Sequence, residues 1–376
     1  MTDVAWIRLS RSSVGAEEKE ALARVIDGAY LGMGEEVRLF EAEIAALIGG
    51  GREVVCTSTG TAALHLAVSC LDIGPGDEVI VPTITYVASF QAVSATGARP
   101  VACDVRAGDV FLDLKDAEKR LTARTRAIMP VHYASGAGGL AEVYAFARAN
   151  NLRVIEDAAH SFGNDRDGVK VGASGDIVCF SFDGIKNITC GEGGAIVTGD
   201  ATLAQRLRDA RLLGVEKDTD ARYGGRRTWT FDVKHQGFRY HMSNLMAALG
   251  RAQLRKLDRF VARRRALAAR YVQAFAGLNG LSTLELDWPH IVPHIFVVKV
   301  RDGARGALAE HLKAEGIETG FHYQPNHQLT FFKADYSLPV AEKLADELLT
   351  LPLHAELTDE EQDRVIIAVM GYFRTR

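Results

Sequence analysis

Between about residues 50 and 200, short β-branched runs alternate with stretches of helical periodicity. Two of the helical stretches are Thr61 to Leu71 and Ala141 to Asn150. This alternation is typical of a mostly parallel sheet with helices on both faces. Ligands of such sheets bind outside the carboxyl ends of the strands, so we expect a functional site at that edge. The predicted strands are Glu53 to Cys56, Glu78 to Val81, Pro100 to Asp104, Ala127 to His132, Arg153 to Asp157, Ile177 to Phe182 and Ala195 to Thr198.

The last third of the chain has a different pattern. A long helix is predicted over Arg239 to Phe260, and residues 294–300 alternate like a half-exposed strand. We therefore predict a large α/β domain over residues 1–254 and a smaller α+β domain over residues 255–376, with the N-terminal segment packed beside the smaller one. Further surface helices are predicted over Arg305 to Glu315, Val340 to Leu349 and Asp359 to Phe373.

Composition excludes several classes of protein. The chain has 376 residues, of which 47% are hydrophobic, so it can bury a large core. Its net charge is -4 and it has no long Lys/Arg block, which argues against a nucleic-acid partner. We find no signal peptide and no apolar run of membrane-spanning length. The five cysteines are scattered, which predicts reduced thiols and a cytoplasmic protein.

A lysine and an upstream acid suggest the chemistry. Asp157 ends an apolar run, and Lys186 lies in a loop between two apolar strands, near Gly191, Gly193 and Gly194. A lysine that forms a Schiff base and an acid that pairs with a pyridinium nitrogen suit pyridoxal 5′-phosphate (PLP). The competing interpretations are a solvated surface lysine and a helix N-cap aspartate.

Neighbouring residues suit the rest of such a cofactor. Gly60 and Thr61 follow a strand and open a helix, where free backbone N–H groups favour a phosphate, although an ordinary N-cap has the same pattern. Ser181 could donate to the same phosphate, and Tyr86 could lie flat on the pyridine ring. His160 could contact the phenolic oxygen, although a lone histidine is more often structural.

Two basic residues precede the long predicted helix. Arg239 and His241 lie at a helix start, which disfavours cations unless they meet an anion. A phosphate in the site of a second subunit would explain them, and a simple surface arginine is the competing interpretation.

Taken together, these segments resemble the DegT/DnrJ/StrS family of PLP-dependent nucleotide-sugar aminotransferases, which have the fold-type I (aspartate aminotransferase-like) architecture. The resemblance covers nearly the whole chain. It includes Phe40-Glu41, the run from Gly74 to Pro82, the run from Thr189 to Gly194 and the run from Leu349 to His354.

The resemblance implies roles for single residues. Lys186 would form the internal aldimine and shuttle the proton, with Asp157 on the ring nitrogen, His160 near the phenolic oxygen and Tyr86 on the ring. Gly60, Thr61 and Ser181 would hold the phosphate, and Arg239 or His241 would reach it across a homodimer interface. The remaining candidates, for contact with the sugar or its diphosphate, are His322, Tyr323, Asn326 and His327. A polar surface loop is the competing interpretation of this last group.

The implied reaction moves an amino group from L-glutamate to a keto group of a nucleotide-linked keto-deoxy sugar, through PLP and pyridoxamine phosphate (PMP). The run from Thr189 to Gly194 favours C4 over C3 of the sugar. No metal is predicted, and no membrane or nucleic-acid partner. Two alternatives stay open: another fold-type I PLP enzyme such as a desulfurase or aldolase, and a non-catalytic sensor or scaffold that holds PLP. A dehydrogenase is disfavoured because Gly28, Gly32 and Gly34 do not follow a strand in a GxGxxG frame.

Overall fold

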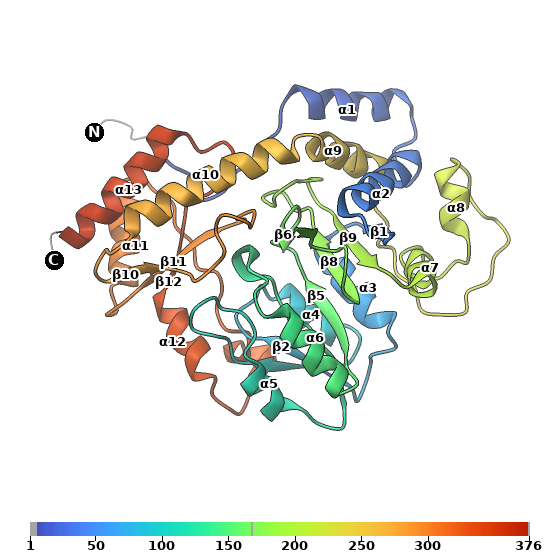
Figure 1. Ribbon diagram of the computed structural model, residues 1–376. Helices are drawn as coiled ribbons and strands as arrows, with labels where there is room; N and C mark the ends of the chain where they lie inside the picture. Colours follow the sequence, from blue (N-terminus) through green and yellow to red (C-terminus); the bar gives the residue numbers. More distant parts are fainter. Residues whose placement is uncertain (1–5, 167, 375–376) are drawn as a thin grey trace.

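A seven-stranded sheet forms the centre of the computed structural model, which describes residues 6–166 and 168–374 (Figure 1). Its strands are β1 (Glu53–Thr57), β2 (Glu78–Pro82), β3 (Arg99–Cys103), β4 (Thr125–Ile128), β5 (Arg153–Asp157), β8 (Ile177–Ser181) and β9 (Gly194–Thr198). They lie in the order β1-β9-β8-β5-β4-β2-β3. β9 is antiparallel to both of its neighbours, and the other pairs are parallel. The predicted mostly parallel sheet is confirmed.

Helices cover both faces of this sheet. Consecutive side chains of a strand point to opposite sides, so neighbouring apolar residues of one strand pack against helices on different faces. Val79 packs in the cluster that contains α3 (Gly60–Ser69), α4 (Ala88–Ser94) and α7 (Ala201–Ala210). Its neighbour Ile80 packs against α5 (Leu114–Arg120) and α6 (Leu140–Ala149). At the other end of the sheet, α2 (Glu35–Ile48) and α9 (Asn244–Leu254) cover this second face. α1 (Ala16–Asp27) packs on α9, and α8 (Asp218–Tyr223) lies beyond α7 (Figure 1).

A second, antiparallel sheet contains β10 (Leu281–Thr283), β11 (Phe296–Val300) and β12 (Leu348–Leu351). Around it lie the long α10 (Leu257–Phe275) and the helices α11 (Arg305–Ala314), α12 (Pro339–Glu347) and α13 (Asp359–Arg374) (Figure 1). Ile7 forms a parallel bridge with Ile317 beside this sheet. A small ribbon of β6 (Asp165–Arg166) and β7 (Val169–Lys170) completes the strands of the described part of the chain. The domain boundary at residues 254 and 255 stays a prediction.

Three predicted elements are wrong in their extent. The helix predicted over Arg239 to Phe260 is two helices, and its first residues are extended, with His241 bridged to Thr57. The helix predicted to end at Leu349 ends at Glu347, because the next residues pair with β11. The strand predicted to reach His132 stops at Ile128, two residues before Pro130, which has no N–H for a ladder.

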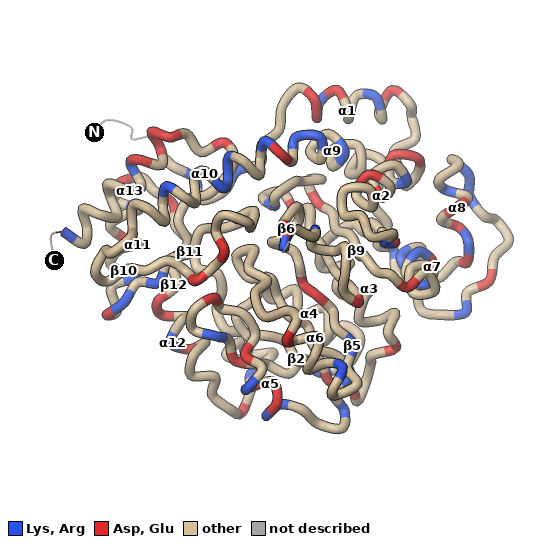
Figure 2. Tube along the Cα trace, in the orientation of Figure 1, with Lys and Arg blue, Asp and Glu red and all other residues tan. Residues whose placement is uncertain are grey.

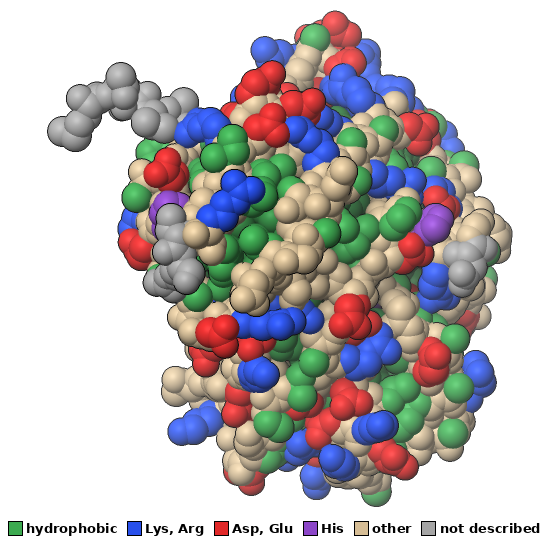
Figure 3. Space-filling model, turned by 60° about the vertical axis from the view of Figure 1, so that its left-hand side comes forward, with side chains coloured by type: hydrophobic (Ala, Val, Ile, Leu, Met, Phe, Trp, Pro, Cys, Tyr) green, Lys and Arg blue, Asp and Glu red, His purple; other side chains and the backbone are tan. Residues whose placement is uncertain are grey.

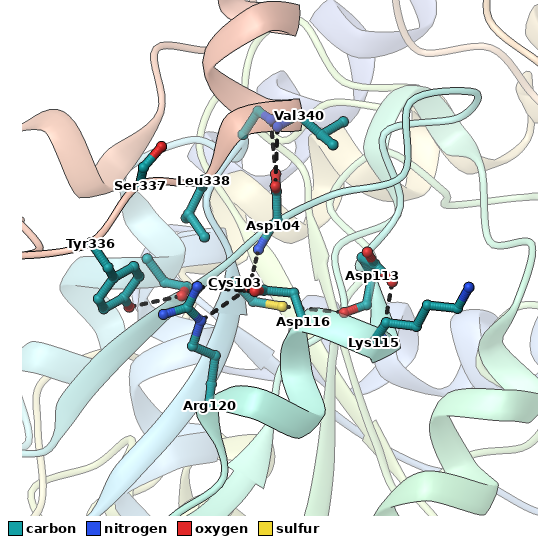
Figure 4. A network of polar contacts seen from close by, with 12 residues as sticks. Cys103, Asp104, Asp113, Lys115, Asp116, Arg120, Tyr336, Ser337, Leu338 and Val340 are labelled. Atoms are coloured by element: carbon teal, nitrogen blue, oxygen red, sulfur yellow. Dashed lines mark hydrogen bonds and ion pairs between the residues drawn. The ribbon is translucent and has the colours of Figure 1, made fainter.

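A polar network fastens α12 to the large sheet (Figure 4). Asp104, just after β3, accepts hydrogen bonds from the backbone N–H groups of Val340 and Ala341 in the first turn of α12, at 3.1 and 2.8 Å. The Arg120 guanidinium lies 3.8 Å from the ring centroid of Tyr336, just before the helix. The N-terminus of α12 is thus capped by an acid 236 residues away in sequence.

Charges of both signs are interspersed over the surface. Figure 2 shows acidic and basic residues interspersed along α1, whereas α10 carries mainly basic residues and the start of α13 mainly acidic ones. On the face in Figure 3 they surround a central area where hydrophobic side chains gather, and no single sign dominates. In the described residues, no helix combines the length and apolarity needed to cross a bilayer.

Candidate active site

A cavity of about 540 Å³ opens at the carboxyl edge of the large sheet. Its walls are the segments that follow β1, β2, β5 and β8, joined by residues from the segment after α11. A larger hollow of about 740 Å³ lies beside α7 and contains none of the predicted site residues. The predicted residues that line the first cavity are Gly60, Thr61, Tyr86, Asp157, His160, Ser181, Lys186, His322 and Tyr323.

The start of α3 forms a cradle at one end of this cavity. Thr59 caps the helix, and its hydroxyl accepts a 2.9 Å hydrogen bond from the Ala62 N–H. Within the described chain, the N–H groups of Gly60 and Thr61 have no hydrogen-bond acceptor. A Cβ on Gly60 would lie 2.7 Å from the Cβ of Ser181, so only glycine lets the helix approach β8 this closely. Free N–H groups, the helix dipole and a serine hydroxyl suit a phosphate.

Asp157 is a buried acid without a cationic partner. It is 6% exposed and ends β5. Ser89 donates a 2.7 Å hydrogen bond to its Oδ2, and the Ala159 N–H donates a 3.2 Å bond to Oδ1. It forms no ion pair in the ranges that the structure describes, and no helix begins after it, which rules out the N-cap interpretation. An isolated buried carboxylate is costly, so the site suits a ligand with a positive charge at this point.

Lys186 lies half-buried in the turn after β8. Its backbone N–H donates to the Asp183 carbonyl at 3.1 Å, and its Nζ lies 3.4 Å from Nε2 of His294. Burial lowers the pKa of Lys186 to about 8, and the charges of Asp157 and Asp183 partly oppose that fall. An amine with a lowered pKa is more often neutral and therefore nucleophilic.

Aromatic and imidazole rings close the opposite wall. The Tyr323 hydroxyl lies 3.2 Å from His160 Nε2, and its ring lies 5.8 Å from that of Tyr86. Nδ1 of His322 contacts the Thr350 hydroxyl at 2.8 Å. Burial lowers the pKa of His322 to about 4 and places that of His160 well below its usual range. Both imidazoles are therefore neutral at pH 7.

Asn326 and His327 do not line the cavity. The Asn326 amide donates to the backbone carbonyls of Thr83 and Thr85 at 3.0 and 2.8 Å. His327 contacts the Thr83 hydroxyl at 2.9 Å through Nδ1. These side chains fasten the segment that carries His322 and Tyr323 to the end of β2.

Arg239 and His241 also lie apart from the cavity lining, although Ser58, next to the cradle, donates to the Tyr240 carbonyl at 2.7 Å. Burial, together with the charges of the neighbouring Arg222 and Arg239, lowers the pKa of His241 to about 4. The segment thus carries the cation of Arg239 outside the cavity lining, with Arg222 of α8 also near His241.

The sequence did not indicate two contacts of this site. Ser89, the partner of Asp157, lies in α4, 68 residues away from it in sequence. His294 comes 108 residues after Lys186, just before β11, and no local pattern connects them. Only the tertiary fold brings these pairs together.

Comparisons with known proteins agree with this arrangement. The DegT/DnrJ/EryC1/StrS aminotransferase family model matches residues 12–370. The aminotransferase TlmJ from Streptoalloteichus hindustanus is 32% identical, with a TM-score of 0.91 over 99% of this chain and 100% of that one. DesV from S. venezuelae, solved in complex with a ketimine intermediate, is 38% identical, with a TM-score of 0.86 over 95% and 94%. Spr1654 from Streptococcus pneumoniae, solved in its PLP-form, is 26% identical, with a TM-score of 0.89 over 98% and 99%.

The architecture and these matches define a class, the PLP-dependent aminotransferases of fold type I. Within that class, the chain belongs to the DegT/DnrJ/EryC1/StrS aminotransferase family. The family, fold and cofactor predicted from the sequence are confirmed, and the protein is a PLP-dependent sugar aminotransferase.

Proposed function

We propose that this enzyme moves an amino group from L-glutamate to the C4 keto group of a nucleotide-linked keto-deoxy sugar. The observation that carries the proposal is the shared cavity of Lys186 and Asp157, with a phosphate cradle at one end. The C4 position rests on the run from Thr189 to Gly194, which is similar to family members that aminate C4. Amination of C3 is the alternative.

Lys186 would act twice. Its amine would link covalently to the cofactor, and after release its Nζ would take a proton from one carbon and return it to another. A pKa of about 8 places this amine close to the pH at which it would work. PLP, when bound, supplies the electron sink that makes the carbon acidic enough to lose its proton.

The other cavity residues would hold and orient the cofactor. Asp157, fixed by Ser89, would pair with the ring nitrogen, which would give this buried carboxylate its missing cation. Gly60, Thr61 and Ser181 would bind the phosphate through the free N–H groups and the hydroxyl. In the same way we assign Tyr86 to the ring face and His160 to the phenolic oxygen.

The sugar would lie against His322 and Tyr323, which line the cavity. We withdraw Asn326 and His327 from the predicted sugar contacts, because their side chains are engaged with Thr83, Thr85 and Glu342. Their role would be to support the segment that carries the other two.

We propose a homodimer in which Arg239 or His241 reaches the phosphate in the partner's site. Two observations support it. Among the residues that the structure describes, no arginine lines the cavity, although both proposed substrates and the cofactor are anionic. The segment that precedes Arg239 exposes apolar side chains, with Trp229 at 84% and Phe231 at 56%, and such exposure is typical of an interface. We place the enzyme in the cytoplasm, a proposal supported by five free cysteines.

Another PLP chemistry has less support. A desulfurase needs a reactive thiolate, but all five cysteines are buried and none lines the cavity. Burial raises the pKa of Cys56 and Cys179 well above the usual range, which disfavours a thiolate. A non-catalytic sensor would keep the cavity but would not turn over substrate.

The proposal is tested with the PLP-loaded protein and a panel of UDP-, GDP- and dTDP-linked keto sugars. We expect glutamate to abolish the visible absorbance band and a 4-keto sugar to restore it with formation of an amino sugar. Lys186→Ala should lose both responses while it keeps the fold. Turnover confined to 3-keto sugars would contradict the C4 assignment, and a band that glutamate leaves unchanged would contradict the choice of donor.

A further inference from the structure

His294 contacts the lysine without lining the cavity. Its Nε2 lies 3.4 Å from Nζ of Lys186, and the residue is only 3% exposed. It is absent from the cavity lining, whereas Lys186 belongs to it. Lys186 therefore both lines the cavity and contacts one buried imidazole outside the cavity lining.

The imidazole is held firmly in place. The backbone N–H of His294 donates to the Ser135 hydroxyl at 3.0 Å, and Arg264 donates to its carbonyl at 3.0 Å. Its ring lies against that of His160, with centroids 4.4 Å apart. Nδ1 is buried and has no hydrogen-bond partner among the residues that the structure describes. The contact with Lys186 is thus the only side-chain hydrogen bond of this ring in that part of the chain.

Burial, helped by the charges around it, keeps this imidazole neutral. Burial lowers the pKa of His294 well below its usual range, and Lys186, His160, Arg264 and His322 add to the fall. The acids near the lysine, Asp157 and Asp183, face it from the cavity side. A neutral imidazole can accept a hydrogen bond from an ammonium or share one with a neutral amine. A carboxylate here would instead stabilise the charged lysine.

We propose that His294 is a positioning residue that receives the Lys186 amine whenever the covalent link to the cofactor is open. The inference rests on the role proposed for Lys186 and adds to it a defined resting place for the free amine. A lysine side chain has four rotatable bonds, and an unheld amine would spread over many positions. Held at one point by His294, the amine stays aligned for the proton transfer and for re-forming the link.

Crystal structures of the cofactor-free and PMP-loaded wild-type protein test the position. We expect Nζ of Lys186 within about 3.5 Å of His294 Nε2 in both. A well-ordered amine that points elsewhere in the PMP form would overturn the inference. This measurement uses no variant, so it decides the question even if changes at His294 prevent folding.

His294→Phe and His294→Gln test the consequence by stopped-flow absorbance. In His294→Phe we expect the return of the visible band from the PMP form to slow about tenfold or more, because the amine is no longer aligned. His294→Gln, which keeps a hydrogen-bonding group, should recover part of that rate. His311→Phe is the matched control, since His311 contacts the Ala368 carbonyl and the Tyr372 ring in α13 and does not line the cavity, and it should behave like the wild type.

The two proposals fail in different ways. If Lys186→Ala keeps a covalently bound cofactor, the proposed role of Lys186 is wrong. If Lys186→Ala loses it but His294→Phe returns to the PLP form as fast as the wild type, only the positioning role of His294 is wrong.

Discussion

At the scale of single residues, the site depends on the environment of one amine. Lys186 is half-buried among neutral imidazoles, and Asp157 and Asp183 supply negative charge nearby. Burial disfavours the ammonium form, and the two acids limit the effect. This balance lowers the pKa of Lys186 to about 8 without making the amine permanently neutral.

We therefore predict an unusual pH profile for this lysine in the cofactor-free protein. Because a lowered pKa means that the proton is lost at lower pH, labelling of Lys186 by acetic anhydride should rise through pH 8. Ordinary lysines become reactive near pH 10.4. Mass spectrometry of the labelled peptides measures this, with the exposed Lys115 as an internal reference. A half-maximal rate above pH 10 would show that the amine is solvated.

Among the secondary-structure elements, α12 depends on a distant residue. Its own N-cap, Leu338, has no capping side chain, and Asp104 binds the free N–H groups instead (Figure 4). The same helix follows the segment that carries His322 and Tyr323, and Asn326 fastens that segment to β2. These links hold the part of the cavity wall that contains His322 and Tyr323 against the large sheet.

Asp104→Ala should lower the free energy of unfolding by about 1–2 kcal/mol, because the first turn of α12 loses its cap. Urea titration measures this loss, and hydrogen exchange should speed up in the first turn of α12. Asp113→Ala is the matched control, since Asp113 caps its own helix α5. It should destabilise the protein without changing exchange in α12. Equal hydrogen-exchange rates in the first turn of α12 in the two variants would contradict the capping of α12 by Asp104.

Local sequence patterns predicted the large sheet well, because each strand and helix has its own periodicity. They also predicted a functional site at the carboxyl edge of the sheet, with Asp157 at the end of its strand, since parallel strands bring their carboxyl ends together. The local patterns failed where tertiary contacts determine the secondary structure or the neighbours of a residue. Leu348 continues a helical pattern yet pairs with Lys299 in β11. His294 reaches Lys186 only through folding across 108 residues.

On the scale of the whole molecule, we propose that one chain leaves the site incomplete. The cavity is lined by several acids but by no arginine, and the substrates proposed for it carry phosphates and carboxylates. The cations of Arg239 and Arg222 lie outside it, on a part of the chain with exposed aromatic side chains. A second copy would supply the missing charge and cover those rings.

We predict that the protein is a dimer, with a mass in light scattering of about twice 40.8 kDa. Trp229→Ser should weaken the dimer and, with it, the affinity for PLP. Arg239→Ala should weaken PLP binding while the dimer persists. Ile367→Ser is the control, because Ile367 is also exposed but lies on α13. A monomer that binds PLP as tightly as the wild type would contradict the shared site.

The central claim is that Lys186 is the residue that binds the cofactor covalently. Borohydride reduction of the PLP-loaded protein, followed by peptide mass spectrometry, tests it most directly. We expect one phosphopyridoxyl group, carried by Lys186, and none in Lys186→Ala. A label on another lysine, or no label on a protein that binds PLP, would contradict it.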